Sequence, residues 1–193
     1  SIKAALALPA PYGILCKIMK SCEGLLLALS PLSSEDQATA TESCELMMSQ
    51  VVTVLAHMSS IGEDTMTVAV KEGLMESLLA IFPTPRMELG SVTPASVTKT
   101  PSRIASALAL GNAAMCLRNF ADDKITGPEI FGNPKLLGVE KMICAMATCT
   151  NLSVRKNIAM LLAKGSRWPG IKEKVVEFRG MEIMRELQAQ GAL

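Results

Sequence analysis

A short pattern recurs four times along this chain of 193 residues: a polar helical turn, then a glycine, then an apolar run. Glycine adopts positive φ at no steric cost, so it suits a point where one helix ends and the next begins. Successive glycines are 49, 65 and 42 residues apart, which predicts repeated helical units that bury their apolar faces against one another. The four are Gly24, Gly73, Gly138 and Gly180.

The composition favours helices over strands. Aromatic residues make up 3% of the chain and apolar residues 49%, with 13 methionines among them. Helices favour Ala, Leu and Met, whereas sheets favour aromatic and β-branched residues. The apolar runs, such as Leu25–Leu29 and Met142–Ala147, are far shorter than the ~18 residues that cross a bilayer. We therefore expect an all-α protein without a membrane-spanning segment or a membrane partner.

Three longer segments, 39–58, 102–120 and 151–164, carry apolar residues at helical spacing. One unit is therefore predicted as two helices joined at a glycine and followed by a third, longer helix. Two loops account for the unequal repeat lengths: residues 30–36, and a Pro/Thr-rich segment, 83–101, that is expected to be mobile.

The run from Gly111 to Ala121 resembles the third-helix signature of the armadillo-repeat superfamily. The resemblance covers most of the chain, because four such units follow one another. It implies one domain, 1–193, folded as a right-handed α-solenoid of about four armadillo-like repeats. The units would be roughly 1–58, 59–121, 122–168 and, in part, 169–193.

In that family the third helices line a concave groove. An asparagine, with a tryptophan one turn earlier, holds an extended peptide there by its backbone. At the asparagine position this chain carries Asn119 once, and none of the tryptophan positions holds tryptophan. The asparagine positions are His57, Asn119 and Lys164, and the tryptophan positions are Thr53, Met115 and Met160.

The C-terminal part, Val154–Lys164 and Ile171–Leu187, resembles the closing unit of tetratricopeptide-repeat/armadillo proteins that assemble axonemal dynein arms in the cytoplasm. Myosin chaperones share the same general plan. The resemblance implies a cytoplasmic, non-enzymatic scaffold or co-chaperone whose partners are dynein subunits and chaperones. Because the chain starts without Met, we expect it to be a fragment of a longer protein.

The charges suggest the chemistry of a partner. Residues 1–90 carry 5 basic and 10 acidic side chains, whereas residues 151–193 carry 8 and 4. A basic rim on the last long helix would attract an acidic segment, and methionines in the groove would adapt to an apolar one. Nucleic acid is not expected, because four glutamates interleave with the basic residues and few aromatics are present for stacking. The predicted groove comprises His57, Met115, Asn119, Arg155, Lys156, Met160 and Lys164.

No pattern predicts catalysis. Six cysteines form no C-x-x-C pair and there is one histidine, so neither a metal site nor a cofactor is expected. No phosphate-binding loop, dinucleotide fingerprint or nucleophile elbow occurs. Two further functions stay open: a peptide-binding adaptor of the transport or adhesion type, and an armadillo-type regulator of a GTPase.

Overall fold

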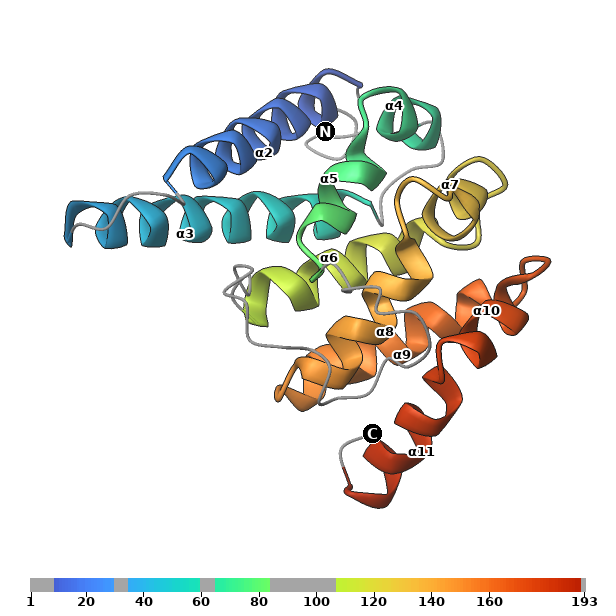
Figure 1. Cartoon of the computed structure of the whole chain (residues 1–193). Coiled ribbons are helices and arrows are strands. Elements are labelled where there is room, and N and C mark those ends of the chain that lie inside the picture. The colour runs from blue at the N-terminus through green and yellow to red at the C-terminus, as the bar shows by residue number, and fades with distance from the viewer. Residues whose placement is uncertain (1–8, 30–34, 60–64, 84–106, 192–193) are drawn as a thin grey trace.

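The computed structural model describes residues 9–29, 35–59, 65–83 and 107–191. Within these ranges the chain forms ten helices and their connecting turns, without a strand, which confirms the all-α class. The helices follow one another in chain order, from α2 at one end to α11 at the other (Figure 1). They are α2 (Pro9–Leu29), α3 (Glu35–Met58), α4 (Thr65–Lys71), α5 (Leu74–Ala80), α6 (Ala107–Phe120), α7 (Thr126–Gly132), α8 (Gly138–Thr148), α9 (Leu152–Gly165), α10 (Ile171–Glu177) and α11 (Gly180–Ala189).

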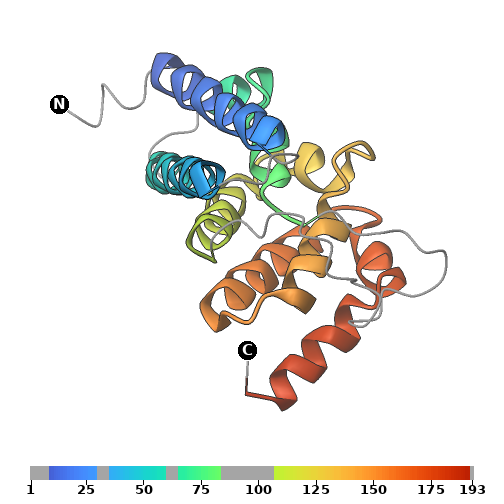
Figure 2. The same ribbon diagram turned by 60° about the vertical axis from the view of Figure 1, so that its left-hand side comes forward.

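The long helices α3, α6 and α9 lie side by side in a row (Figures 1 and 2). They run parallel, because residue numbers rise together across each interface. Asn112 of α6 donates to Thr53 Oγ1 of α3 at 2.6 Å, and Asn119 donates to Ser59 at 2.9 Å. The predicted segments 39–58, 102–120 and 151–164 are thus confirmed as helical in the described residues, except for Asn151, which directly precedes α9.

Each long helix that follows α3 is preceded in the chain by a pair of shorter helices. Helices α4 and α5 precede α6, α7 and α8 precede α9, and α10 and α11 form a third pair. Every pair is joined through a residue in the left-handed conformation: Gly73 at φ 72°, Leu137 at φ 52° and Arg179 at φ 57°. The prediction of a left-handed glycine is therefore correct at Gly73 and wrong by one residue at the other two junctions.

Gly138 and Gly180 are needed for space rather than for positive φ. A Cβ at Gly138 would lie 2.0 Å from the carbonyl oxygen of Ile130. One at Gly180 would lie 3.0 Å from the side chains of Ile143 and Val175. The absence of a side chain lets the second helix of each pair approach the first closely.

The break predicted at Gly24 is wrong, because α2 continues through this residue from Pro9 to Leu29. Cys16, Met19 and Cys22 are buried along the preceding turns, and their packing holds the helix together. A glycine within a helix costs only about 1 kcal/mol, which tertiary packing readily offsets. The predicted loop 83–101 lies outside the described residues, apart from Pro83. Of the predicted loop 30–36, the structure describes only residues 35 and 36, and both belong to α3.

Candidate partner-binding site

Asn119, which the family resemblance predicts as a peptide-binding residue, lies at the end of α6. Its amide Nδ2 donates to Ser59 Oγ at 2.9 Å and to the carbonyl oxygen of Ala56 at 3.3 Å. Both acceptors lie at the C-terminal end of α3, and both residues are buried. In this structure the amide therefore fastens α6 to the end of α3.

Lys164 occupies the same position at the end of α9 and makes the equivalent contact to α6. Its Nζ donates to the carbonyl oxygen of Arg118 at 3.2 Å and pairs with Asp122 at 2.5 Å. The Arg118 guanidinium in turn approaches Met160 Sδ at 3.5 Å. Asp122 also pairs with Arg167 at 3.1 Å. Lys164 and Met160 thus contribute to the interface between neighbouring long helices.

The other predicted groove residues lie apart from these contacts. Arg155 donates through Nε to the carbonyl oxygen of Cys149, which directly follows α8. Met115 is half-buried against the core, whereas His57 and Lys156 are exposed. The structure brings Asn119, Met160 and Lys164 to the helix row, and leaves His57 and Lys156 facing solvent.

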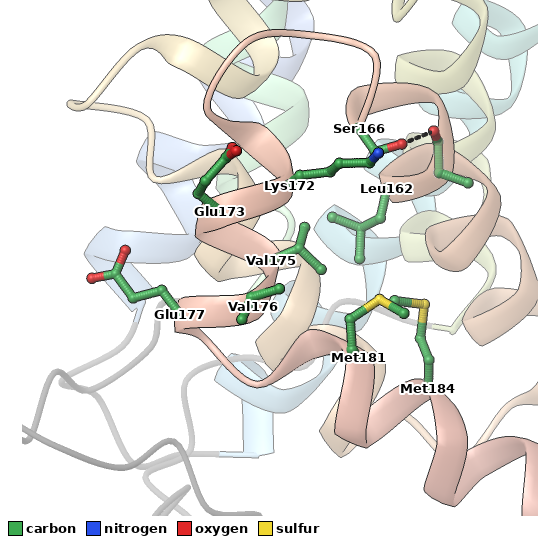
Figure 3. A pocket seen from close by; sticks show the side chains of 10 residues that line it. Leu162, Ser166, Lys172, Glu173, Val175, Val176, Glu177, Met181 and Met184 are labelled. Atoms are coloured by element: carbon green, nitrogen blue, oxygen red, sulfur yellow. Dashed lines mark hydrogen bonds between the residues drawn. The ribbon is translucent and has the colours of Figure 1, made fainter.

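An apolar hollow lies beyond α9, and we call it the C-terminal groove. It measures about 840 Å³ and is enclosed by the end of α9, by α10 and by the start of α11. Figure 3 shows the aliphatic and thioether side chains of the three helices converging on this space, with Glu173 and Glu177 directed away from it. It is lined by Leu162, Ala163, Ser166, Lys172, Glu173, Val175, Val176, Glu177, Met181 and Met184.

The chemistry of the C-terminal groove suits an apolar partner. Val176 is 61% exposed and Met181 is 41% exposed, although both are large apolar side chains. Ser166 is the only hydroxyl among the lining residues, and it donates to the carbonyl oxygen of Ala163 at 2.7 Å. Most of the lining side chains are aliphatic or thioether groups, so the groove offers shape and apolar surface.

Sequence reasoning missed this groove. Val176, Met181 and Met184 are separated in sequence from Leu162 and Ser166 by the turn at 166–170, and the sequence does not place them together. The available signal was the methionine content, because flexible thioethers are common on surfaces that adapt to apolar partners.

Among the described residues, no group of three His, Cys, Asp or Glu side chains could hold a metal ion. None of the described helices combines the length and the apolarity that crossing a membrane requires.

Burial raises the pKa of Cys116 to about 12 and that of Cys16 to about 11. Both thiols are protonated near neutral pH and are poor nucleophiles.

We expect iodoacetamide at pH 8 to modify the half-buried Cys44 and Cys149 at least about tenfold faster than Cys116, because the thiolate is the reactive form. Peptide mapping by mass spectrometry after timed quenching measures the rates. Labelling in denaturant serves as the control, in which all three cysteines should react alike. Equal rates in the folded protein would contradict the burial of Cys116.

Comparisons with protein-family models, with curated proteins and with solved structures gave no significant match.

Proposed function

We propose that this chain is a non-enzymatic scaffold that binds another protein through the C-terminal groove. The observation that carries the proposal is the groove itself, an apolar hollow of about 840 Å³ in which Val176 and Met181 remain exposed. Contiguous exposed apolar surface rimmed by polar residues marks protein interaction sites, and here Lys172, Glu173 and Glu177 stand at the edge of the apolar lining. The volume falls within the range of ordinary ligand and partner sites.

The proposal includes the architecture of the scaffold. We take α4–α6 and α7–α9 as two successive armadillo-like units, with α2–α3 before them and α10–α11 as the beginning of a fourth. The order of two short helices and one long helix supports this reading, as does the parallel row of α3, α6 and α9. In a solenoid of this type each unit contacts its neighbours, and the groove would lie at the edge of the last unit.

The finer part of the proposal is a role in the cytoplasm, in the assembly of dynein arms or as a related co-chaperone. It is supported by the resemblance of residues 154–187 to the closing unit of such assembly factors. The partners would then be dynein subunits and chaperones, bound through an apolar or acidic segment.

A double variant, Val176→Glu with Met181→Glu, tests the scaffold. Both side chains are exposed, so the fold should persist, while two carboxylates in an apolar hollow should abolish docking. We expect the unmodified chain to capture dynein heavy or intermediate chains and chaperones from a ciliated-cell lysate, and the variant to lose them at least about tenfold. Quantitative mass spectrometry measures the capture.

Leu152→Glu is the matched control, because Leu152 is 53% exposed on α9 and lies outside the groove. It should capture the same proteins as the unmodified chain. Charge reversal at Arg155 or Lys164 is a poorer test, since both side chains also bond to backbone carbonyls. Loss of a non-ciliary partner from the groove variant would keep the scaffold and overturn the dynein assignment. Equal capture by all three proteins would overturn the groove as the binding site.

A further inference from the structure

The C-terminal ends of α3 and α9 are built alike. Ser59 directly follows α3, and its hydroxyl donates to the carbonyl oxygen of Ala56 at 2.9 Å. Ser166 directly follows α9, and its hydroxyl donates to the carbonyl oxygen of Ala163 at 2.7 Å. Each pair consists of an alanine and a serine three residues apart, so each helix end presents the same two acceptors.

In α3 this pair is covered by the next long helix. Asn119 of α6 donates to both acceptors of α3, and Ala56 and Ser59 are only 2% and 4% exposed as a result. The equivalent end of α6 is covered by α9 in the same way, because Lys164 donates to the carbonyl oxygen of Arg118 and Trp168 to that of Ala121.

In α9 the equivalent pair lines the C-terminal groove. Ala163 is exposed and Ser166 is half-exposed, and Figure 3 shows the bond of Ser166 at the upper rim of the hollow. Helix α6 packs on the preceding long helix, α3, and on the preceding short helix, α5, and α9 packs on α6 and α8. The groove between α9, α10 and α11 is therefore the next position along the same row.

We propose that an amphipathic helix of a partner protein occupies this position, parallel to α9, and that a side-chain amide near its C-terminal end donates to Ser166 Oγ and to the carbonyl oxygen of Ala163. This inference rests on the proposed function and specifies the partner. The apolar stripe of the helix would pack on Val176, Met181 and Met184, which line the groove and keep exposed apolar surface.

The donor is an amide rather than an ammonium group. Lys164 is accommodated at the end of α6 because Asp122 pairs with it at 2.5 Å. At the end of α9 the residue in the place of Asp122 is Arg167, and the side chain of Lys172 extends toward Ser166 (Figure 3). Arg167 itself pairs with Asp122 at 3.1 Å, so a lysine from the partner would meet the like charge of Lys172 without a carboxylate in the place of Asp122. A neutral amide can donate there without repulsion.

The experiment uses a synthetic helix as the probe. Its sequence is that of residues 107–122, with Cys116→Ala and a side-chain staple on the face away from α3, and its companion differs only by Asn119→Leu. We expect the amide probe to bind the full chain about five- to tenfold more tightly than the leucine probe, as for one buried hydrogen bond. With Ser166→Ala in the protein, the preference should shrink to about twofold. Fluorescence anisotropy of labelled probes gives all four dissociation constants.

Two further measurements make the result decisive. The Val176→Glu and Met181→Glu double variant should bind neither probe, and sedimentation of the chain alone should show no dimer that this variant removes. Equal affinity of the two probes, or a preference unchanged by Ser166→Ala, would overturn the amide contact. Failure of both probes to bind, while the double variant still loses its lysate partners, would overturn the helix and leave the scaffold standing. A dimer removed by the double variant would assign the groove to a second copy and overturn the proposal.

Discussion

A Gly138→Ala variant is expected to lose about 3 kcal/mol or more of unfolding free energy. The new Cβ would lie 2.0 Å from the carbonyl oxygen of Ile130 and 3.2 Å from its carbonyl carbon. Backbone atoms cannot swing aside as the end of a flexible side chain can, so α7 and α8 would have to separate. Urea unfolding followed by circular dichroism at 222 nm measures the loss.

Gly24→Ala is the matched control for this variant. Gly24 lies inside α2, and a Cβ there would meet no atom within 4 Å. Because alanine is the better helix former, the control should gain about 0.5–1 kcal/mol. Similar stabilities for the two variants would show that the close approach of Gly138 to Ile130 is not present in solution.

Replacing the single tryptophan, Trp168→Ala, is expected to cost about 3 kcal/mol. Its indole Nε1 donates to the carbonyl oxygen of Ala121 at 2.9 Å, and its ring fills the space beside Gly127, where a Cβ would lie 2.3 Å from the ring. The side chain therefore joins the end of α9 to the end of α6 and to α7. Thermal melts recorded by circular dichroism measure the change.

Trp168→Phe separates the two contributions, because phenylalanine keeps most of the packing and removes the hydrogen bond. It should cost about 1 kcal/mol. If Trp168→Ala were as stable as the unmodified chain, the indole would not join α9 to its neighbours.

The long helices could be predicted from sequence because their apolar spacing is regular and their ends carry local signals. Asn151 precedes α9, and its side chain accepts from the backbone of Val154 at 3.2 Å, as an N-cap does. The junctions were harder to place. Leu137 and Arg179 take the left-handed conformation one residue before their glycines, since the glycine itself is needed where a neighbouring helix comes close.

The candidate site could be predicted only in part, since it depends on contacts between distant residues. The sequence shows that Asn119 and Lys164 occupy equivalent positions on their helices. It does not show that both side chains reach a carbonyl group of the preceding long helix. The acceptors of Asn119 lie 60 and 63 residues earlier in the chain. The C-terminal groove likewise exists only once α10 and α11 fold against the end of α9.

The parallel row also has an electrostatic consequence. Each helix carries a partial negative charge at its C-terminal end, and in a parallel arrangement these ends gather at one edge of the molecule, where they repel one another. The last turns of α3, α6 and α9 each contain a basic residue: His57, Arg118 and Lys164 respectively. The charged side chains of Arg118 and Lys164 therefore reduce this repulsion at the ends of α6 and α9.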